Sequence, residues 1–272
     1  MVARVNRSFA TSEVPGTRFA DVRWVAETGS TNRDLLAAAA EGVPEGLVLV
    51  ADHQTAGRGR LDRAWIAPAG ASLLVSALLR PDVEPEDLFL LTLACGLAAA
   101  DAVEEVAGVR PGLKWPNDLV VADGPLADRK LAGILAESHV VKGKVDAVVV
   151  GMGLNLDWPP ELPEELAETA ASVNHLTGGS VDREDVLVAW LRHYDRHLTA
   201  ITTEIERGEF LDEVRAASAT LGRDVRVERS DGFFEGHAIA IADDGRLLVD
   251  CGGDGGVVAV TVGDIVHARL LG

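Results

Sequence analysis

The sequence predicts an α/β or α+β domain followed by a small all-β module, and two patterns carry this prediction. Between residues 21 and 221, apolar runs of strand length alternate with segments of helical periodicity. After Gly222, short apolar runs alternate with turn sequences, and no helical pattern intrudes. With 272 residues and a hydrophobic content of 47%, the chain can bury a full-sized core.

The larger domain is expected to open with a helix and two strands. Ser30 or Thr31 is a typical N-cap, apolar residues follow at helical spacing, and Gly42 ends the segment. Two apolar runs, 46–51 and 72–79, have the length and composition of buried strands.

The second half of this domain is expected to contain three helices and four strands. A long helix over 85–106 places its apolar residues on one face, with proline in its first turn. Pro116 and Gly124-Pro125 then separate the strands, which suggests hairpins. Two further helices are predicted, one over 182–207 that Asp182 caps and one over 210–221. The four expected strands are 113–115, 119–121, 130–137 and 145–150.

The module after Gly222 is expected to contain five short strands. Glycine-containing turns such as Asp231-Gly232 and Gly252-Gly253 separate them. The expected strands are 225–227, 237–241, 247–249, 257–260 and 265–268.

Composition excludes several classes of protein. Acidic residues outnumber basic ones 43 to 25, giving a formal net charge of −18, which disfavours DNA binding. No apolar run approaches the roughly 20 residues of a membrane span. Cys95 and Cys251 are too few for a disulfide framework, so we expect reduced core cysteines and a cytoplasmic protein. Residues 1–20 lack the apolar centre of a secretory signal and are expected to form a disordered tail.

Three arginines lie in one glycine-punctuated segment of this acidic chain. We call residues 57–63, Gly-Arg-Gly-Arg-Leu-Asp-Arg, the arginine loop. Arginine presents a planar fork of donors that fits a carboxylate or a phosphate. In an extended loop Arg58 and Arg60 would share one side and could grip one anion together. Gly-Arg pairs also occur in plain solvent loops, so the loop alone is only suggestive.

Three later segments complete a recognisable set. They are Lys-Trp-Pro-Asn-Asp at 114–118, Arg-Lys-Leu-Ala-Gly-Ile-Leu-Ala-Glu at 129–137 and Gly-Met-Gly-Leu-Asn-Leu at 151–156. Together with the arginine loop, the set resembles the biotin protein ligases from about Trp24 to the C-terminus. The resemblance implies an α+β fold: a catalytic domain like those of class II aminoacyl-tRNA synthetases and biotin ligases over 21–221, with a mixed sheet and flanking helices. It also implies a small SH3-like β-barrel over 222–272.

The resemblance implies a two-step reaction. The family joins biotin to ATP, with Mg²⁺, to form biotinyl-5'-AMP and pyrophosphate. A lysine of a biotin carboxyl carrier domain then attacks the mixed anhydride. The expected acceptors are the carrier domains of acetyl- or acyl-CoA carboxylase or of pyruvate carboxylase. Both steps need positive charge placed next to the negative charge that develops in the transition state.

The resemblance also assigns residues by their places in the motifs. It implies catalytic roles for Lys130, Arg60, Arg58 and Asp118, with Asp118 also as a candidate Mg²⁺ ligand. It implies biotin contacts from Ser30, Thr31, Gln54, Gly57, Arg58, Arg60, Lys130, Gly133 and Leu135. It implies ATP contacts from Arg60, Arg63, Trp65, Asn117, Asp118, Lys130 and Asn155.

Two of these residues also have simpler explanations. Lys130 could be a lysine at a strand entrance with its head in water. By period two it is expected to share a face with Ala132 and Ile134. Trp65 could be an edge aromatic. In the arginine loop, Leu61-Asp62 departs from the family pattern, and an aspartate there is expected to pair with one of the arginines and weaken it.

Other functions of the same fold stay open at this stage. A lipoate protein ligase or octanoyltransferase is the main alternative, although the arginine loop with Ser30 and Gln54 favours a ureido ligand. A biotin-responsive repressor is disfavoured, because the residues before Trp24 leave no room for a helix-turn-helix. A pure ligand-binding module would not need Lys130 together with three arginines. A weak homodimer is compatible with the sequence.

Overall fold

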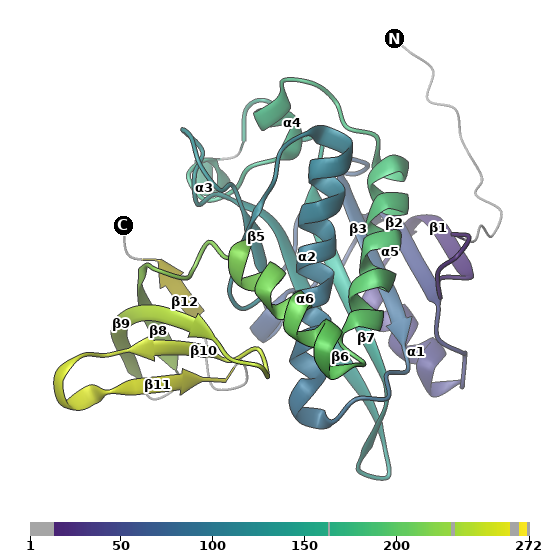
Figure 1. Ribbon diagram of the computed structural model, residues 1–272. Coiled ribbons are helices and arrows are strands. Elements are labelled where there is room, and N and C mark those ends of the chain that lie inside the picture. Colours follow the sequence, from purple (N-terminus) through teal and green to yellow (C-terminus); the bar gives the residue numbers. More distant parts are fainter. Residues whose placement is uncertain (1–13, 163, 230–231, 262–266, 271–272) are drawn as a thin grey trace.

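The computed structural model describes residues 14–162, 164–229, 232–261 and 267–270. The chain forms a seven-stranded sheet and a separate five-stranded sheet near the C-terminus (Figure 1). In the larger sheet β1 and β2 are parallel while the other described pairs are antiparallel, so the sheet is mixed as expected. Its order is β1-β2-β3-β7-β6-β5-β4, with β1 Asp21–Thr28, β2 Leu47–Gln54, β3 Ser72–Leu79, β4 Gly112–Lys114, β5 Asp118–Val120, β6 Lys130–Val141 and β7 Lys144–Asn155.

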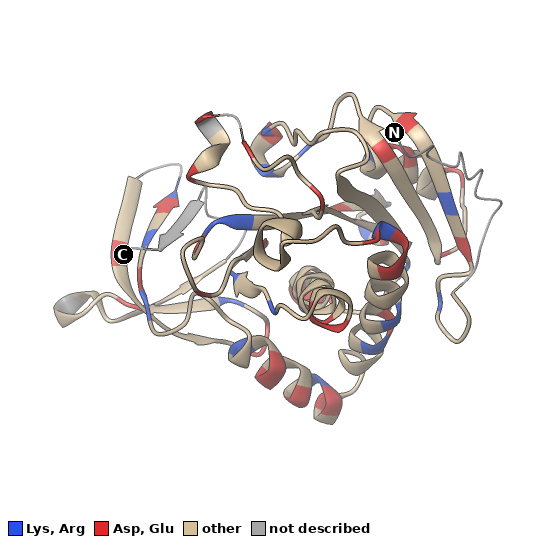
Figure 2. Ribbon diagram, turned by 90° about the horizontal axis from the view of Figure 1, so that it is seen from above, with Lys and Arg blue, Asp and Glu red and all other residues tan. Residues whose placement is uncertain are grey.

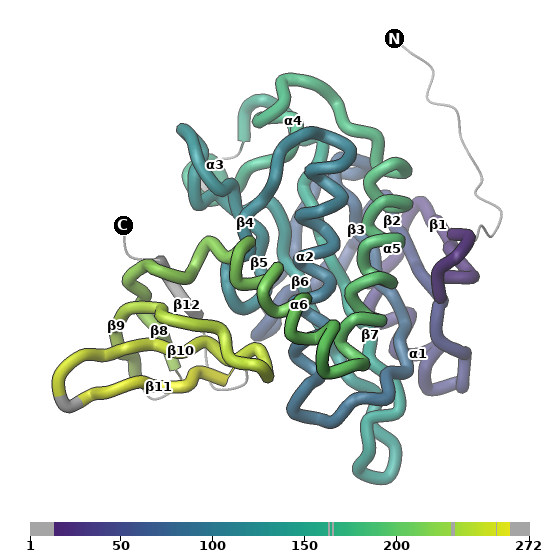
Figure 3. Tube along the Cα trace, in the orientation of Figure 1, coloured from purple at the N-terminus to yellow at the C-terminus, as the bar shows by residue number. Residues whose placement is uncertain are grey.

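Helices cover the two faces of this sheet unequally. The α2 helix crosses the centre of one face with α5 and α6 beside it (Figures 1 and 3). On the opposite face α1 covers only part of the sheet, where Leu35 and Ala39 pack with Leu78 and Val149. The bounds are α1 Thr31–Ala40, α2 Leu88–Ala107, α3 Glu164–Ala167, α4 Val173–Thr177, α5 Arg183–Ala200 and α6 Glu204–Ala216.

The part of this face beyond the first turn of α1 is rich in glycine. Gly133 of β6 pairs with Gly153 of β7, and Gly151 lies two residues earlier on β7. We call these three residues the glycine floor. Because glycine has no side chain, another group can lie directly on the backbone of the sheet here.

One strand and one helix break were missed by the sequence predictions, and several predicted strands, such as β6 and β7, are longer than expected. The strand β1 was not predicted. The helix expected to run through residue 207 instead ends at Ala200, and α6 begins at Glu204. Thr203 explains the break, because its hydroxyl accepts a hydrogen bond from the backbone N–H of Glu206 and so caps a new helix.

The N-terminal segment is packed from residue 14 onward. Phe19 is fully buried and stacks on Tyr194 with ring centroids 5.9 Å apart. Arg18 Nε lies 2.7 Å from Asp195 Oδ1. The expected disordered tail is therefore wrong for residues 14–20, because this segment supplies an aromatic side chain to the core. Residues 1–13 lie outside the described part of the chain.

The C-terminal sheet has the order β11-β10-β9-β8-β12. Its edge strands β11 and β12 contain four residues each, and no pairing between them occurs among the described residues. Closure of a barrel requires the two edges to hydrogen-bond, so the predicted SH3-like closed barrel is not observed. The bounds are β8 Asp224–Arg229, β9 Gly232–Ile241, β10 Leu247–Asp250, β11 Val257–Val260 and β12 His267–Leu270.

The C-terminal sheet contacts the larger domain at the segment before the Asn-Asp pair. The indole N–H of buried Trp115 donates to the carbonyl of Gly245, 3.0 Å away. Arg223 forms an ion pair with Asp128 at 2.6 Å. The turn that holds Gly245 is therefore fastened to the chain next to β5.

Charge and cysteine placement bear on the compositional predictions. The outward side of α6 is strongly acidic, as Figure 2 shows for the molecule seen from above; its exposed acids are Glu204, Glu206, Glu209, Asp212 and Glu213. Among the described helices, none is long and apolar enough to cross a bilayer.

Both cysteines are free thiols. Cys95 is buried as expected, but Cys251 is only partly buried because it follows the end of β10.

Candidate active site

The indole of Trp65 lies on the glycine floor. A Cβ atom at Gly153 would be 2.4 Å from Trp65 Cε2, and one at Gly133 would be 2.9 Å from Trp65 Cζ3. Side chains at these two positions would therefore collide with the ring. The paired glycines of β6 and β7 serve a close approach to the sheet, and Trp65 is the group that approaches in this structure.

Lys130 reaches the same face as Gly133. Its Nζ lies 3.0 Å from the position of a Cβ at Gly133 and 5.4 Å from the centroid of the Trp65 ring. Ala132 and Ile134, by contrast, are core residues. The expectation that Lys130 shares their face is wrong, because the pairing of β5 with β6 slips by one residue between Leu119 and Val120. Such a bulge turns a side chain to the other face.

Asp118 faces Lys130 across the β5–β6 pair. It is the cross-strand partner of Gly133, and its Oδ1 lies 2.6 Å from Lys130 Nζ. The separation is short, yet Oδ1 has no well-aligned hydrogen bond among the described residues. The contact is therefore an ion pair, and the carboxylate keeps capacity to accept hydrogen bonds.

The arginine loop is folded on itself, and its arginines diverge. Gly59 N–H donates to the carbonyl of Arg63 at 2.7 Å, and Trp65 N–H donates to that of Gly57. Leu61 and Asp62 both have positive φ. This turn replaces the extended loop of the sequence prediction. A Cβ at buried Gly57 would lie 2.6 Å from the carbonyl oxygen of Trp65, so the loop requires glycine there.

Each arginine of the loop has a different environment. Arg58 contacts Asp62 at 2.9 Å and Glu137 at 3.3 Å, so Asp62 pairs with this arginine. Arg63 is exposed. Arg58 and Arg60 are thus not placed to bind one anion together in this structure.

Arg60 is directed to the β4–β5 connection. Its NH1 donates to Asn117 Oδ1 at 3.4 Å, and Asn117 Nδ2 donates to the carbonyl of Ile134. Burial lowers the pKa of Arg60; Asp118 opposes this shift, and Arg63 adds to it. A cation that is partly desolvated beside another cation is well placed to receive an anion.

A second group of polar side chains joins α1, β2 and β3. Ser30 and Thr31 are buried at the start of α1. Within the described chain Ser30 makes no side-chain capping bond, so the helix does not use its hydroxyl. Gln54 Oε1 accepts from the backbone N–H of Thr31 at 2.8 Å. Ser76 Oγ lies 2.7 Å from Thr31 Oγ1, which extends the network into the sheet.

The sequence reading missed Asn32, Ser76 and Glu137, which belong to this network. Asn32 lies over Gly151, where a Cβ would be 2.0 Å from its Oδ1. Its amide donates to the carbonyl of Leu135 at 3.1 Å and to Glu137 Oε2 at 2.9 Å. Leu135 itself is half-buried. Period two could have found Glu137, because it shares a face of β6 with Gly133 and Leu135.

Asn155 lies at the end of β7, beside the backbone of Lys130. Its Nδ2 donates to the carbonyl of Ala171 at 3.0 Å, while its Oδ1 is buried without a partner among the described residues. Trp65 Nε1 likewise has no partner there, while Asp118 Oδ1 has the ion pair with Lys130 but no well-aligned hydrogen bond. Buried polar atoms are normally hydrogen-bonded, so these three atoms around one lysine indicate a ligand site.

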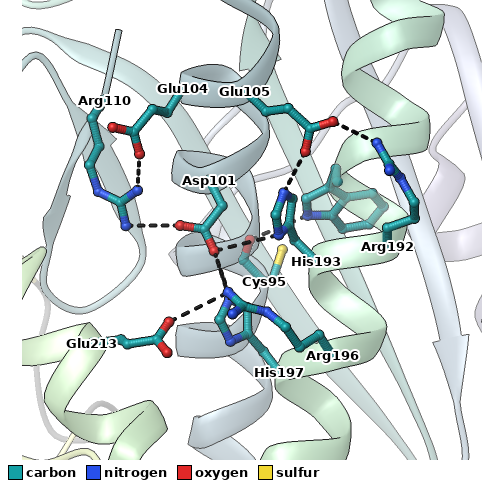
Figure 4. A network of polar contacts seen from close by, with 11 residues as sticks. Cys95, Asp101, Glu104, Glu105, Arg110, Arg192, His193, Arg196, His197 and Glu213 are labelled. Atoms are coloured by element: carbon teal, nitrogen blue, oxygen red, sulfur yellow. Dashed lines mark hydrogen bonds and ion pairs between the residues drawn. The ribbon is translucent and has the colours of Figure 1, made fainter. Parts of the chain in front are cut away.

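A second cluster of acids and histidines lies between α2, α5 and α6 (Figure 4). Asp101, His197 and Glu213 have ligand atoms close enough to hold a metal ion. However, the NH2 of Arg196 lies 3.0 Å from Asp101, 3.2 Å from His197 and 3.5 Å from Glu213. A guanidinium thus stands among the three ligand atoms, and the cluster is an ion-pair network that ties the helices together.

Comparisons with known proteins show the family of this chain. The model of the biotin/lipoate A/B protein ligase family matches residues 25–155, and that of the biotin protein ligase C terminal domain matches residues 220–268. The biotin–[acetyl-CoA-carboxylase] ligase of Mycobacterium tuberculosis is 42% identical over 260 residues, covering 93% of this chain and 91% of that protein. This chain belongs to the biotin protein ligase family.

Other members of the biotin protein ligase family are also similar over most of the chain. The biotin–[acetyl-CoA-carboxylase] ligase of Paracoccus denitrificans is 33% identical and covers 83% of this chain and 92% of its own length. A solved structure of the Aquifex aeolicus biotin protein ligase in complex with biotin and ATP superposes with a TM-score of 0.79. It is 30% identical and covers 93% of this chain and 100% of that one. Family membership therefore extends over both sheets.

Proposed function

We propose that this protein is an ATP-dependent biotin ligase that forms biotinyl-5'-AMP and transfers biotin to a lysine of a carrier domain. One observation carries the proposal: Lys130 lies on the glycine floor, paired with Asp118, beside buried polar atoms of Trp65 and Asn155 that have no hydrogen-bond partner among the described residues. A ligand with an anionic group for Lys130, an acceptor for the indole N–H of Trp65 and a donor for the amide oxygen of Asn155 would satisfy these groups.

Lys130 and Arg60 are proposed to bring the two anionic substrates together. Biotin carboxylate and ATP repel each other, and both cations lie beside the β4–β5 hairpin, where Asp118 and Asn117 hold them. Positive charge fixed before the reaction stabilises the transition state without reorganisation. The carboxylate oxygen attacks the α-phosphorus, the bond to the bridging oxygen breaks, and pyrophosphate leaves. In the second step a carrier amine attacks the acyl carbon, loses a proton, and AMP leaves.

The polar network of α1, β2 and β3 is proposed as the ureido end of the biotin site. Ser30, Thr31 and Gln54 supply hydroxyl and amide groups there, and Gly57, Gly133 and Leu135 line the path to Lys130. A cyclic urea needs donors and acceptors within a mainly apolar slot. Trp65, Asn117, Asn155 and Arg63 are proposed on the nucleotide side, with Arg58 at the biotin carboxylate.

Mg²⁺ is proposed to bind with the phosphates of ATP. It prefers one or two carboxylates together with substrate oxygens. Asp118 fits this requirement, because its carboxylate lies beside Lys130 and opposite Gly133 on the neighbouring strand. The bound ion would neutralise phosphate charge.

The partners proposed are biotin carboxyl carrier domains, and we expect no binding to DNA. The exposed acids of α6 and the net charge of −18 would repel a phosphate backbone. A cytoplasmic location and a weak homodimer complete the proposal. We treat residues 21–221 as the catalytic domain and 222–272 as the C-terminal domain.

A lipoate or octanoyl ligase is the alternative within the wider family. The part-buried Thr31–Gln54 pair favours biotin, since a plain acyl chain offers these groups no partner. The test is incubation of the purified protein with a carrier domain, ATP and Mg²⁺, with either biotin or lipoate, followed by mass measurement of the carrier. A mass increase with biotin alone supports the proposal. Modification by lipoate alone would refute it.

A further inference from the structure

Glu137 occupies a position between two parts of the site that are distant in sequence. It lies on β6, on the same face as Gly133 and Leu135. One carboxylate oxygen, Oε2, accepts from the side-chain amide of Asn32 in α1 at 2.9 Å. The other, Oε1, lies 3.3 Å from Arg58 NH1 in the arginine loop. The carboxylate therefore bridges α1 and the loop.

The Asn32 side of this bridge is rigid. Asn32 is 5% exposed, and both of its amide protons are used, one by Glu137 and one by the carbonyl of Leu135. Its Oδ1 accepts from Ser76 Oγ at 2.6 Å. Gly151 gives it space on the sheet. A side chain with every polar atom satisfied in a buried place is a fixed point for the carboxylate.

The Arg58 side sets the position of the loop. Arg58 makes two ion pairs, but Asp62 is 87% exposed whereas the side chain of Glu137 is only 22% exposed. Ion pairs between exposed groups contribute little, so Glu137 is the stronger partner. The pair with Asp62 lies within the loop, and among the contacts described only the pair with Glu137 joins Arg58 to the sheet.

We propose that Glu137 is a positioning residue that fixes Arg58, and with it the arginine loop, relative to α1. Its role is to place the loop where it closes over the biotin end of the site. The inference rests on the proposed biotin ligase function. It explains why Arg58 already has two carboxylate partners in the free protein, while Arg60 is directed to the Asn117 side.

The test compares Glu137→Gln with the wild-type protein in a pyrophosphate-release assay with biotin, ATP and Mg²⁺. The amide keeps the shape but loses the charge. We expect KM for biotin to rise about tenfold with a much smaller change in kcat, because binding geometry and not the chemical step is lost. Amide exchange of residues 55–64 should also become faster. Asp62→Asn is the matched control and should leave both readouts near wild type.

Further variants keep the inference testable if Glu137→Gln is unstable. Glu137→Asp keeps the charge but shortens the reach, and it should also raise KM for biotin. In a double-mutant cycle, the effects of Arg58→Gln and Glu137→Gln should be less than additive, because both remove the contact between these two residues. An unchanged KM in both Glu137 variants, or fully additive effects in the cycle, would overturn the inference. Absence of biotin-dependent pyrophosphate release by the wild type would instead overturn the proposed function.

Discussion

Lys130 Nζ lies 2.6 Å from Asp118 Oδ1, although the two residues are twelve positions apart and lie on neighbouring strands. The β-bulge opposite Leu119 and Val120 makes this contact, because it turns Lys130 to the face that carries Gly133. A half-buried carboxylate thus holds the cation over the glycine floor. The pairing gives a charged lysine a fixed position before any substrate is present.

Lys130→Ala is expected to lower the rate of biotinyl-5'-AMP formation by about a hundredfold or more, because it removes a fixed cation from the reacting centre. Pyrophosphate release with biotin and ATP is the measurement. Circular dichroism should be unchanged, since the side chain is not part of the core. A rate within twofold of the wild type would exclude the role of Lys130.

Arg60→Gly is expected to let the intermediate escape. We expect biotinyl-5'-AMP still to form, because Lys130 is intact, and then to label lysines on bystander proteins. The measurement is biotin attached to albumin in the same mixture. Arg33→Ala is the control, because Arg33 is an exposed arginine of α1 with no proposed role in the site. Equal albumin labelling by wild type and Arg60→Gly would contradict retention by this residue.

Gly153→Ala is expected to displace Trp65, since the new Cβ would lie 2.4 Å from its ring. We expect KM for ATP to rise about tenfold if the displaced indole is a nucleotide contact worth 1–2 kcal/mol. Gly208→Ala is the control, because nothing lies within 4 Å of that position. In a Trp65→Ala background the Gly153→Ala substitution should add no further defect. A further rise in KM for ATP in that background would show that Gly153→Ala acts through the backbone of β7 and not through displacement of the Trp65 ring.

Asp101→Asn is expected to destabilise the protein by about 2 kcal/mol at pH 7. The pKa of Asp101 is lowered to about 2: burial opposes this shift, and the contacts with His197 and Arg110 outweigh it. A depressed carboxyl pKa stabilises the fold above the unfolded value near 4, and this stability is lost as pH falls towards 2. The difference between wild type and variant in urea unfolding should therefore shrink over that range. A difference independent of pH would show that the charge of Asp101 is not responsible.

Sequence patterns predicted most of the secondary structure because its signals are local. Strand β3 matches its predicted range, and Gly108 ends α2 with a left-handed conformation close to the predicted end. The break at Thr203 was also local, but the capping sequence was overlooked within a longer helical pattern. Strand β1 was not predicted, because the alternation of apolar and polar residues along it is weak. Half of its residues are partly buried.

The sequence by itself determined the family, the mixed α+β fold of the larger domain and the set of motifs that form the site. These depend on residue identity and on spacing along the chain. Only the tertiary structure decided which face Lys130 occupies, which carboxylates hold Arg58, and that Asn32 bonds to Glu137. A register slip of one residue and contacts between residues as far apart as 32 and 137 decide these features. Neither leaves a periodic signal in the chain, because both arise from how the strands and α1 pack together.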